Sequence, residues 1–344
     1  MRIGILCPSE IALRRFMPAL EQVDGMNFVG LAVNSPEERY GDKLPDNTEI
    51  DLMLAKEREK AQAFINGYGG KIFNSYEEII ASEEIGALYI PLPPGLHFKW
   101  AQKALIANKH VLVEKPSTMK ASDTEELIKI AKKRGMALHE NYMFSFHSQL
   151  DEIDNIIHSG ELGQVRLYRV NFGFPIREQY DFSYVIALGG GALMDAGGYT
   201  IKYACRLLGC NAKIAYAQLN KVAGYEVDMF GSGVLVNEEG MAVQIAFGMD
   251  NAYKCELEVW GSKGCLVTNR ILTAPGGFKP FVRIKKNNEE EIRSLSVDDT
   301  FKKSIEYFIS CIKSKEVRFE SYKAINRQAK LVEDFYSMSQ NHFN

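Results

Sequence analysis

Residues 87–113 read ALYIPLPPGLHFKWAQKALIANKHVLV, with an apolar run at Ala87–Ile90, a helical pattern at Phe98–Ala107 and a second apolar run at His110–Val113. Strands that alternate with helices need crossover connections and therefore form a parallel sheet. The same alternation extends from Ile3–Cys7 to Met136–His139. The pattern predicts a doubly wound, Rossmann-type α/β domain, in which ligands bind at the carboxyl ends of the strands.

Further elements of this first part follow from local signals. Asn27–Val33 is a second strand-like run, and a helix before it has its apolar side at Ile11, Phe16, Met17 and Leu20. We predict a helix over Glu59–Ile65 and capping boxes at Ser75–Glu78 and Ser122–Glu125. The polar stretch Asn34–Asp51 is longer than a usual βα connection and predicts an inserted loop. A lid, a subunit contact and a tolerated insertion all remain open for it.

After about residue 145 the pattern changes to longer alternating runs joined by short polar turns, which indicates a mostly antiparallel sheet. The predicted strands are Val165–Phe174, Lys213–Val222, Asp228–Val236, Met241–Met249, Lys254–Trp260 and Cys265–Leu272. The predicted helices are Leu150–Ser159, Ala192–Leu208, Phe301–Lys313 and Ala324–Met338. We therefore expect a dinucleotide-binding domain over residues 1–142 and an α+β domain over residues 143–344 for substrate binding and oligomerisation. Packing of the C-terminal helix back on the first domain is an open option.

The composition argues against several classes of protein. The 344 residues are 46 % hydrophobic and 25 % charged, as in a globular enzyme with room for two domains. The formal net charge of −3 offers no basic field for nucleic acid or an anionic membrane surface. The sequence holds no run of about 18 apolar residues for a membrane helix. Its six cysteines and six histidines lack metal-ligand spacing, so we expect reduced thiols, no metal and a cytoplasmic location.

The turn after the first strand is a weak dinucleotide signal. The three glycine positions of G-x-G-x-x-G hold Cys7, Ser9 and Ala12. Ala12 is small enough for close packing of helix on strand, and Ser9 leaves room for the backbone to approach a pyrophosphate, whereas Cys7 departs from the pattern.

The end of the second strand favours NADP. An acid there would accept bonds from the adenosine ribose and reject a 2′-phosphate. This chain has the neutral Asn34 and Ser35, followed by the basic Lys56 and Arg58. We expect NADP as the cofactor, with NAD as the open alternative.

Lys115 and Tyr199 are the candidate catalytic residues. Lys115 follows an apolar strand, in Glu114-Lys115-Pro116, where such folds place ligands. Asp195 and Tyr199 are four residues apart and share one face of a helix that follows three glycines. Reduction of a ketone needs a hydride on carbon and a proton on oxygen. Tyr199 can supply the proton, because a nearby ammonium lowers a phenol pKa from about 10, and Lys115 can hold the cofactor ribose or the developing alkoxide.

Two stretches resemble the Gfo/Idh/MocA family of oxidoreductases. One is Tyr89-Ile-Pro-Leu-Pro-Pro-Gly-Leu-His97 followed by Lys109–Pro116, which ends in the Glu-Lys-Pro of that family. The other is residues 189–199, Gly-Gly-Gly-Ala-Leu-Met-Asp-Ala-Gly-Gly-Tyr, which resembles the family's D-x-G-x-H segment with Tyr199 in the His place. The resemblance runs nearly end to end. It implies a cofactor site formed by Cys7, Pro8, Ser9, Ile11, Asn34, Ser35, Lys56, Arg58, Pro91, Leu92, Pro93, His97, Glu114 and Lys115.

With tyrosine at position 199, the chain resembles one branch of this family. That branch contains glucose–fructose oxidoreductase, dihydrodiol and xylose dehydrogenases and nucleotide-sugar 3-ketoreductases. His139–Gln149 looks most like the last of these, which reduce a nucleotide-linked keto sugar. The resemblance implies substrate contacts from Glu140, Asn141, His147, Gln149, Asp195 and Tyr199. Ser145 and Ser183 depart from the branch, where arginine is common.

Three functions remain open at this stage. The first is a sugar or nucleotide-sugar ketoreductase, and the second is a free-sugar or dihydrodiol dehydrogenase. The third is a non-catalytic dinucleotide-binding sensor, which the degenerate turn at Cys7–Ala12 permits, although a sensor has no need of a proton donor. Because an open sheet in the second domain would expose an apolar face, we also expect a homodimer or homotetramer formed through it.

Overall fold

The computed structural model describes residues 1–40, 46–178, 181–287 and 289–340. These fall into two compact units, one containing residues 1–141 and 301–326 and the other residues 142–300 and 327–344, of which 341–344 lie outside the described residues. The expected boundary after residue 142 lies one position from the first division. The last division, after residue 326, falls inside the long C-terminal helix.

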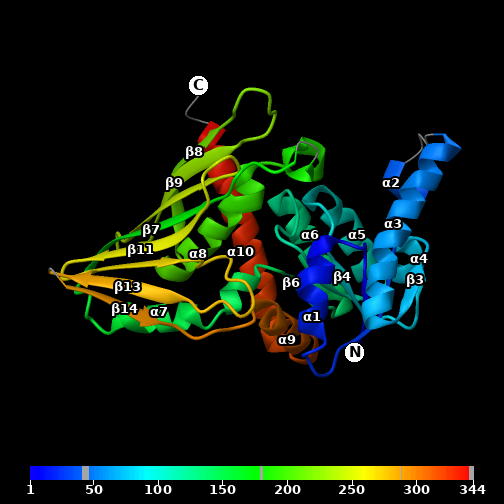
Figure 1. Ribbon diagram of the computed structural model, residues 1–344, viewed down its shortest axis with the longest axis horizontal. Helices are drawn as coiled ribbons and strands as arrows, with labels where there is room; N and C mark the ends of the chain where they lie inside the picture. The colour runs from blue at the N-terminus through cyan, green and yellow to red at the C-terminus, as the bar shows by residue number, and fades with distance from the viewer. Residues whose placement is uncertain (41–45, 179–180, 288, 341–344) are drawn as a thin grey trace. The chain divides into compact units, whose positions relative to one another are not determined.

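The first unit is built on a six-stranded sheet in which every pairing is parallel (Figure 1). The order β3-β2-β1-β4-β5-β6 is that of doubly wound dinucleotide-binding sheets, so this part of the prediction is confirmed. The strands are β1 (Arg2–Ile5), β2 (Asn27–Ala32), β3 (Lys71–Phe73), β4 (Ala87–Ile90), β5 (His110–Val113) and β6 (Leu138–Glu140). β4 is buried at all four positions, because helices cover both faces of such a sheet.

The helices of this unit differ from the predictions in several places. They are η1 (Ala12–Phe16), α1 (Met17–Leu20), α2 (Pro36–Tyr40), α3 (Asn47–Tyr68), α4 (Tyr76–Ala81), α5 (Pro94–Ile106), α6 (Ala121–Arg134), α9 (Thr300–Lys313) and the first part of α10 (Lys315–Gln340). Ser75 caps α4 as predicted, by accepting the N–H of Glu78. Ser122 instead lies inside α6, which begins after Lys120 without a side-chain cap. Ile11 is exposed, so it does not belong to the apolar side of its helix.

The predicted loop at Asn34–Asp51 is wrong for much of its length. α2 occupies part of it, and α3 begins at Asn47, twelve residues before the predicted helix start. The sequence did not predict the start of α3 because few residues of this helix are both apolar and buried. These are Met53, Ala61 and Phe64. Residues 41–45 of the segment lie outside the described residues.

The second unit is an eight-stranded sheet in the order β14-β13-β12-β11-β7-β10-β9-β8. Among the described residues of this unit, only β7 and β10 pair in parallel, so the predicted open, mostly antiparallel sheet is confirmed. Its strands are β7 (Val165–Gly173), β8 (Lys213–Asn220), β9 (Phe230–Val236), β10 (Ala242–Gly248), β11 (Lys254–Gly261), β12 (Cys265–Asn269), β13 (Phe281–Lys286) and β14 (Glu289–Ser294). The sequence analysis missed β13 and β14, whose charged residues obscure the alternation.

Helices cover one face of this sheet (Figure 1). They are α7 (Gln149–His158), η5 (Leu193–Gly197), α8 (Gly198–Leu208) and the end of α10, and short helical turns η2 (Met143–Phe146), η3 (Phe182–Tyr184) and η4 (Ile186–Leu188) connect them. The inward residues of the strands pack with these helices into one apolar cluster that includes Phe247 and Phe335. No helix in the described part of the chain is long and apolar enough to cross a membrane.

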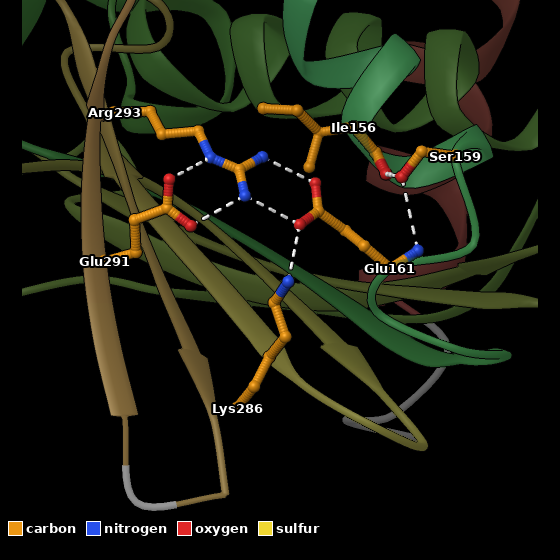
Figure 2. A network of polar contacts seen from close by, with 6 residues as sticks. All are labelled: Ile156, Ser159, Glu161, Lys286, Glu291 and Arg293. Atoms are coloured by element: carbon orange, nitrogen blue, oxygen red, sulfur yellow. Dashed lines mark hydrogen bonds and ion pairs between the residues drawn. The ribbon is translucent and has the colours of Figure 1, made fainter.

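A charged network joins the end of α7 to the edge strands of this sheet (Figure 2). Arg293 donates to both carboxylate oxygens of Glu161, at 2.6 and 2.8 Å, and Lys286 donates to one of them at 2.7 Å. Glu291 accepts two further bonds from Arg293. The hydrogen bonds from Arg293, together with Lys286, lower the pKa of Glu161 to about 2.

We expect Glu161→Gln to lower the free energy of unfolding by about 1 kcal/mol at neutral pH, since a bidentate arginine pair is stronger than an ordinary surface ion pair. Because the folded-state pKa lies below the ordinary value of 4.5, this stability is present above pH 4.5 and is lost as the pH falls toward 2. Urea unfolding over this range should show the two proteins converging in acid. Glu289→Gln, at the exposed start of β14, is the control, and an equal effect of both changes would contradict the assignment.

Candidate active site

The turn after β1 is compact and closed by its own side chains. Ser9 Oγ accepts the N–H of Ala12 at 3.2 Å, and the Cys7 thiol donates to the carbonyl oxygen of Pro91 at 3.5 Å. Burial raises the pKa of Cys7 to about 12, so the thiol stays protonated. Ala12 is fully buried, as the close approach of helix to strand requires. Small residues therefore line this turn even though the glycines are missing.

The end of β2 offers a free acceptor and, unexpectedly, an acid. Asn34 Oδ1 is buried and has no hydrogen-bond partner in the described chain. Glu38, which α2 brings back to this place, accepts the backbone N–H groups of Ser35, Tyr76 and Glu77 at 2.8 to 3.0 Å. The sequence analysis missed this carboxylate because it looked for an acid directly after the strand.

The two basic residues predicted to bind the cofactor, Lys56 and Arg58, lie on α3. Arg58 donates to Asn74 Oδ1 at 3.0 Å, beyond the end of β3, and Lys56 is exposed. The charges that act on the Cys7 thiol are instead those of Glu57 and Lys60. Helical spacing could have revealed Glu57, which lies on the buried stripe of α3 four residues after Met53, whereas Lys60 is exposed.

Glu114 is held by hydrogen bonds inside the first unit. Its Oε1 accepts the hydroxyl of Tyr89 and the amide of Asn141, both at 2.6 Å, while Asn141 accepts the hydroxyl of Ser304 at 2.7 Å. Burial raises the pKa of Glu114, although these hydrogen bonds and Lys115 oppose the change. Glu114 thus anchors the strand end that carries Lys115, and the amide of Asn141 is occupied by this network.

The backbone around Lys115 is held from two further directions. The two ring nitrogens of His97 lie 2.8 Å from the carbonyl oxygen of Pro116 and 2.6 Å from that of Leu92. Glu140 accepts the N–H of Ser117 at 2.7 Å. Burial lowers the pKa of His97 to about 4, so the ring is neutral near pH 7 and donates to one carbonyl at a time. His97 is fully buried and therefore acts on this site through the backbone.

Tyr199 stands in an aromatic enclosure of the second unit. Its ring meets Tyr142 edge-on at 5.2 Å, Phe172 at 5.3 Å and Phe144 at 5.6 Å between centroids. The tyrosine is 7 % exposed. Such contacts restrict the position of the ring.

Asp195 lies in the π-helical turn η5, directly before α8, and is paired with a residue that the sequence analysis overlooked. Arg177 lies 2.7 Å from both Asp195 Oδ2 and Ser183 Oγ, and its guanidinium covers the ring of Phe174. Arg177 thus places a guanidinium beside both Asp195 and Ser183. It lies 18 positions before Asp195 along the chain, so no short motif links the two residues.

His147 and Gln149, the other predicted substrate residues, are buried in the second unit. Gln149 donates its backbone N–H to His147 Nδ1 at 3.1 Å. Its side-chain amide lies 3.4 Å from the carbonyl oxygen of Arg270. The structure thus brings these two residues together at the start of α7.

The comparisons with known proteins agree with this geometry. Residues 26–142 match the model of the oxidoreductase family with an NAD-binding Rossmann fold, and residues 150–267 match the GFO/IDH/MocA C-terminal domain. A dTDP-3,4-didehydro-2,6-dideoxy-alpha-D-glucose 3-reductase from Actinomadura kijaniata is 33 % identical over 333 residues, covering 97 % of this chain and 94 % of the relative.

Solved structures extend the likeness. A 3-ketoreductase from Actinomadura kijaniata, in complex with NADP and TDP-benzene, superposes with a TM-score of 0.88 at 32 % identity over 98 % of this chain and 97 % of its own. An aldose-aldose oxidoreductase from Caulobacter crescentus shares the fold, with a TM-score of 0.82 at 21 % identity over 99 % of this chain and 98 % of its own. The fold and the family models define an NAD(P)-dependent oxidoreductase. The chain belongs to the Gfo/Idh/MocA family.

Proposed function

We propose that this protein reduces the keto group of a nucleotide-linked keto sugar with NADPH. The observation that carries the proposal is the end-to-end similarity to dTDP-keto-sugar 3-reductases, at 31 to 33 % identity for four relatives. Solved structures of the Actinomadura kijaniata reductase also include variants in which one lysine or one tyrosine is replaced. The same two residue types are the candidate catalytic residues of this chain.

The described residues fit a dinucleotide at the carboxyl edge of the first sheet. The small residues of the turn after β1 admit a diphosphate, and the unpartnered oxygen of Asn34 can accept a bond from a ribose hydroxyl. When bound, the nicotinamide cofactor supplies the hydride. The chain supplies the remaining chemistry, with Tyr199 donating a proton to the substrate oxygen and Lys115 providing positive charge for the ribose or the developing alkoxide.

Two alternative functions, a free-sugar dehydrogenase and a non-catalytic sensor, differ from this proposal in the substrate that the protein would convert. A D-xylose 1-dehydrogenase (NADP(+)) from Haloferax volcanii is 26 % identical over 317 residues, covering 92 % of this chain and 90 % of its own, which favours a free-sugar dehydrogenase as the second candidate. A non-catalytic sensor would bind the cofactor and turn over neither substrate.

The deciding experiment follows NADPH absorbance with dTDP-3,4-didehydro-2,6-dideoxy-α-D-glucose, with NADH in parallel. Faster loss of NADPH than of NADH is expected, and D-xylose with NADP⁺ should give no comparable rate. Oxidation of xylose alone would favour the second candidate. Failure to bind either cofactor at millimolar concentration would overturn the enzymatic proposal.

We also propose that the protein is a cytoplasmic homodimer or homotetramer. Its six cysteines are free thiols, as in a reducing compartment. On the sheet face opposite the helices, Tyr216, Phe230, Trp260 and Ile292 are 40, 39, 53 and 61 % exposed. Apolar surface of this kind is commonly covered by a partner.

Light scattering tests the oligomer and should report twice or four times the monomer mass. Trp260→Glu should shift the protein toward monomer, whereas Phe319→Glu, at an exposed aromatic on α10, should not. A monomeric wild-type protein would contradict the proposal.

A further inference from the structure

Asp228, just before β9, reaches the glycine run that precedes the proposed catalytic residues. Its Oδ2 accepts the N–H of Leu193 at 2.7 Å, although the two residues are 35 positions apart. Its backbone carbonyl accepts the N–H of Ala192 at 2.8 Å. The first N–H groups of a helix have no partner within the helix, and Asp228 satisfies two of them from a distant part of the chain.

The glycines of this run are required by space rather than by flexibility. A Cβ on Gly191 would lie 2.3 Å from Asp228 Oδ1, and the residue has a φ of +120°, which side chains rarely adopt. A Cβ on Gly190 would lie 2.5 Å from the carbonyl oxygen of Ser183. The structure thus shows Gly190 and Gly191 closely packed.

The segment held in this way carries both proposed site residues of the second unit. The N–H of Asp195 donates to the carbonyl oxygen of Gly191 at 3.0 Å, so Gly191 links Asp228 to the turn η5. Tyr199 is the second residue of α8, which follows η5 directly. Tyr199 lies six residues after Leu193, about 9 Å along a helix, so a shift at Leu193 is transmitted to both side chains.

We propose that Asp228 is a positioning residue. Together with Gly191 it forms a latch that sets the location of Asp195 and Tyr199, and so controls turnover without contacting the cofactor. Its consequence for catalysis rests on the proposed function, whereas the latch itself does not.

Hydrogen–deuterium exchange tests the latch without any substrate. Asp228→Ala and Gly191→Ala should both speed exchange of the amides of residues 191–199, whereas Asp228→Asn, whose amide oxygen can still accept from Leu193, should protect them nearly as the wild type does. Ser75→Ala removes the cap of α4, far along the chain from any proposed catalytic residue, and should leave these amides unchanged. Gly224→Ala is the control for backbone strain alone. Gly224 also has a positive φ, of +90°, but nothing lies within 4 Å of its added Cβ.

Kinetics then test the consequence. Asp228→Ala and Gly191→Ala should lower kcat about tenfold or more, as expected for misplaced catalytic groups, while the dissociation constant for NADPH stays within twofold. Asp228→Asn should recover most of the rate, which a merely destabilising substitution would not predict. Should Asp228→Ala fail to fold, Gly191→Ala and Asp228→Asn still provide the comparison.

Protected amides and an unchanged kcat in both Gly191→Ala and folded Asp228→Ala would overturn the proposal, as would failure of Asp228→Asn to differ from Asp228→Ala. A wild-type protein that binds NADPH and turns over no keto sugar would defeat the proposed function. The exchange experiment would still decide the latch.

Discussion

Replacement of Tyr199 by phenylalanine is expected to lower kcat by about 10²–10⁴-fold, the range for loss of a general acid. Phenylalanine preserves the ring contacts with Tyr142, Phe144 and Phe172 and removes only the hydroxyl. Cofactor affinity should change little, because the phenol acts on substrate oxygen. Stopped-flow reduction with saturating NADPH, together with NADPH fluorescence titration, measures both quantities.

The same helix provides a matched control. Tyr203 lies one turn further along α8, is fully buried, and its hydroxyl has no hydrogen-bond partner in the described residues. Tyr203→Phe therefore removes an unsatisfied hydroxyl and should leave kcat unchanged, with stability equal or slightly higher. If Tyr199→Phe retains the wild-type rate, another group donates the proton and the role proposed for this residue is wrong.

Lys115→Met is expected to lower kcat/KM by about 10²–10³-fold, the usual result of removing a charged group that stabilises a developing oxyanion. Methionine retains much of the side-chain length, and the surrounding backbone stays held by Glu114, Glu140 and His97. A fall in kcat with unchanged NADPH affinity would place the ammonium on the reacting oxygen. A weaker NADPH affinity would place it on the cofactor ribose.

Lys120→Met, a few residues later on an exposed position, controls for loss of one positive charge and should have no kinetic effect. Lys115→Arg keeps the charge but changes its shape, so partial recovery is expected if charge is what the reaction needs. Wild-type kinetics in Lys115→Met would remove this residue from the mechanism.

Much of the fold could be predicted because its signals are local. β4 and β5 match the predicted ranges at both ends, and the Ser75 cap was read from four residues. The prediction failed where local pattern is weak. The polar helix α3 and the charged strands β13 and β14 are stabilised mainly by the apolar surface that other segments cover when they pack against them. The local sequence of these three elements therefore does not predict them.

The candidate site divides in the same way. Lys115 and Tyr199 could be chosen from the sequence because each belongs to a short motif with its own chemical logic. The contacts that hold the segment before Tyr199 could not, because Arg177 and Asp228 act on residues that lie 6 to 35 positions away along the chain.

The sequence alone determined an α/β domain followed by an open antiparallel sheet, and it predicted a lysine and a tyrosine as the catalytic residues. Those features depend on the period of the hydrophobic residues and on motifs of a few residues. Both can be recognised in the sequence because neither involves contacts between distant segments. Only the tertiary structure decided that Arg177 pairs with Asp195, that Glu38 accepts the N–H groups of Tyr76 and Glu77, and that Asp228 fills the space beside Gly191. Each of these depends on where the folded backbone brings two separate segments, and no periodicity in the sequence encodes that meeting.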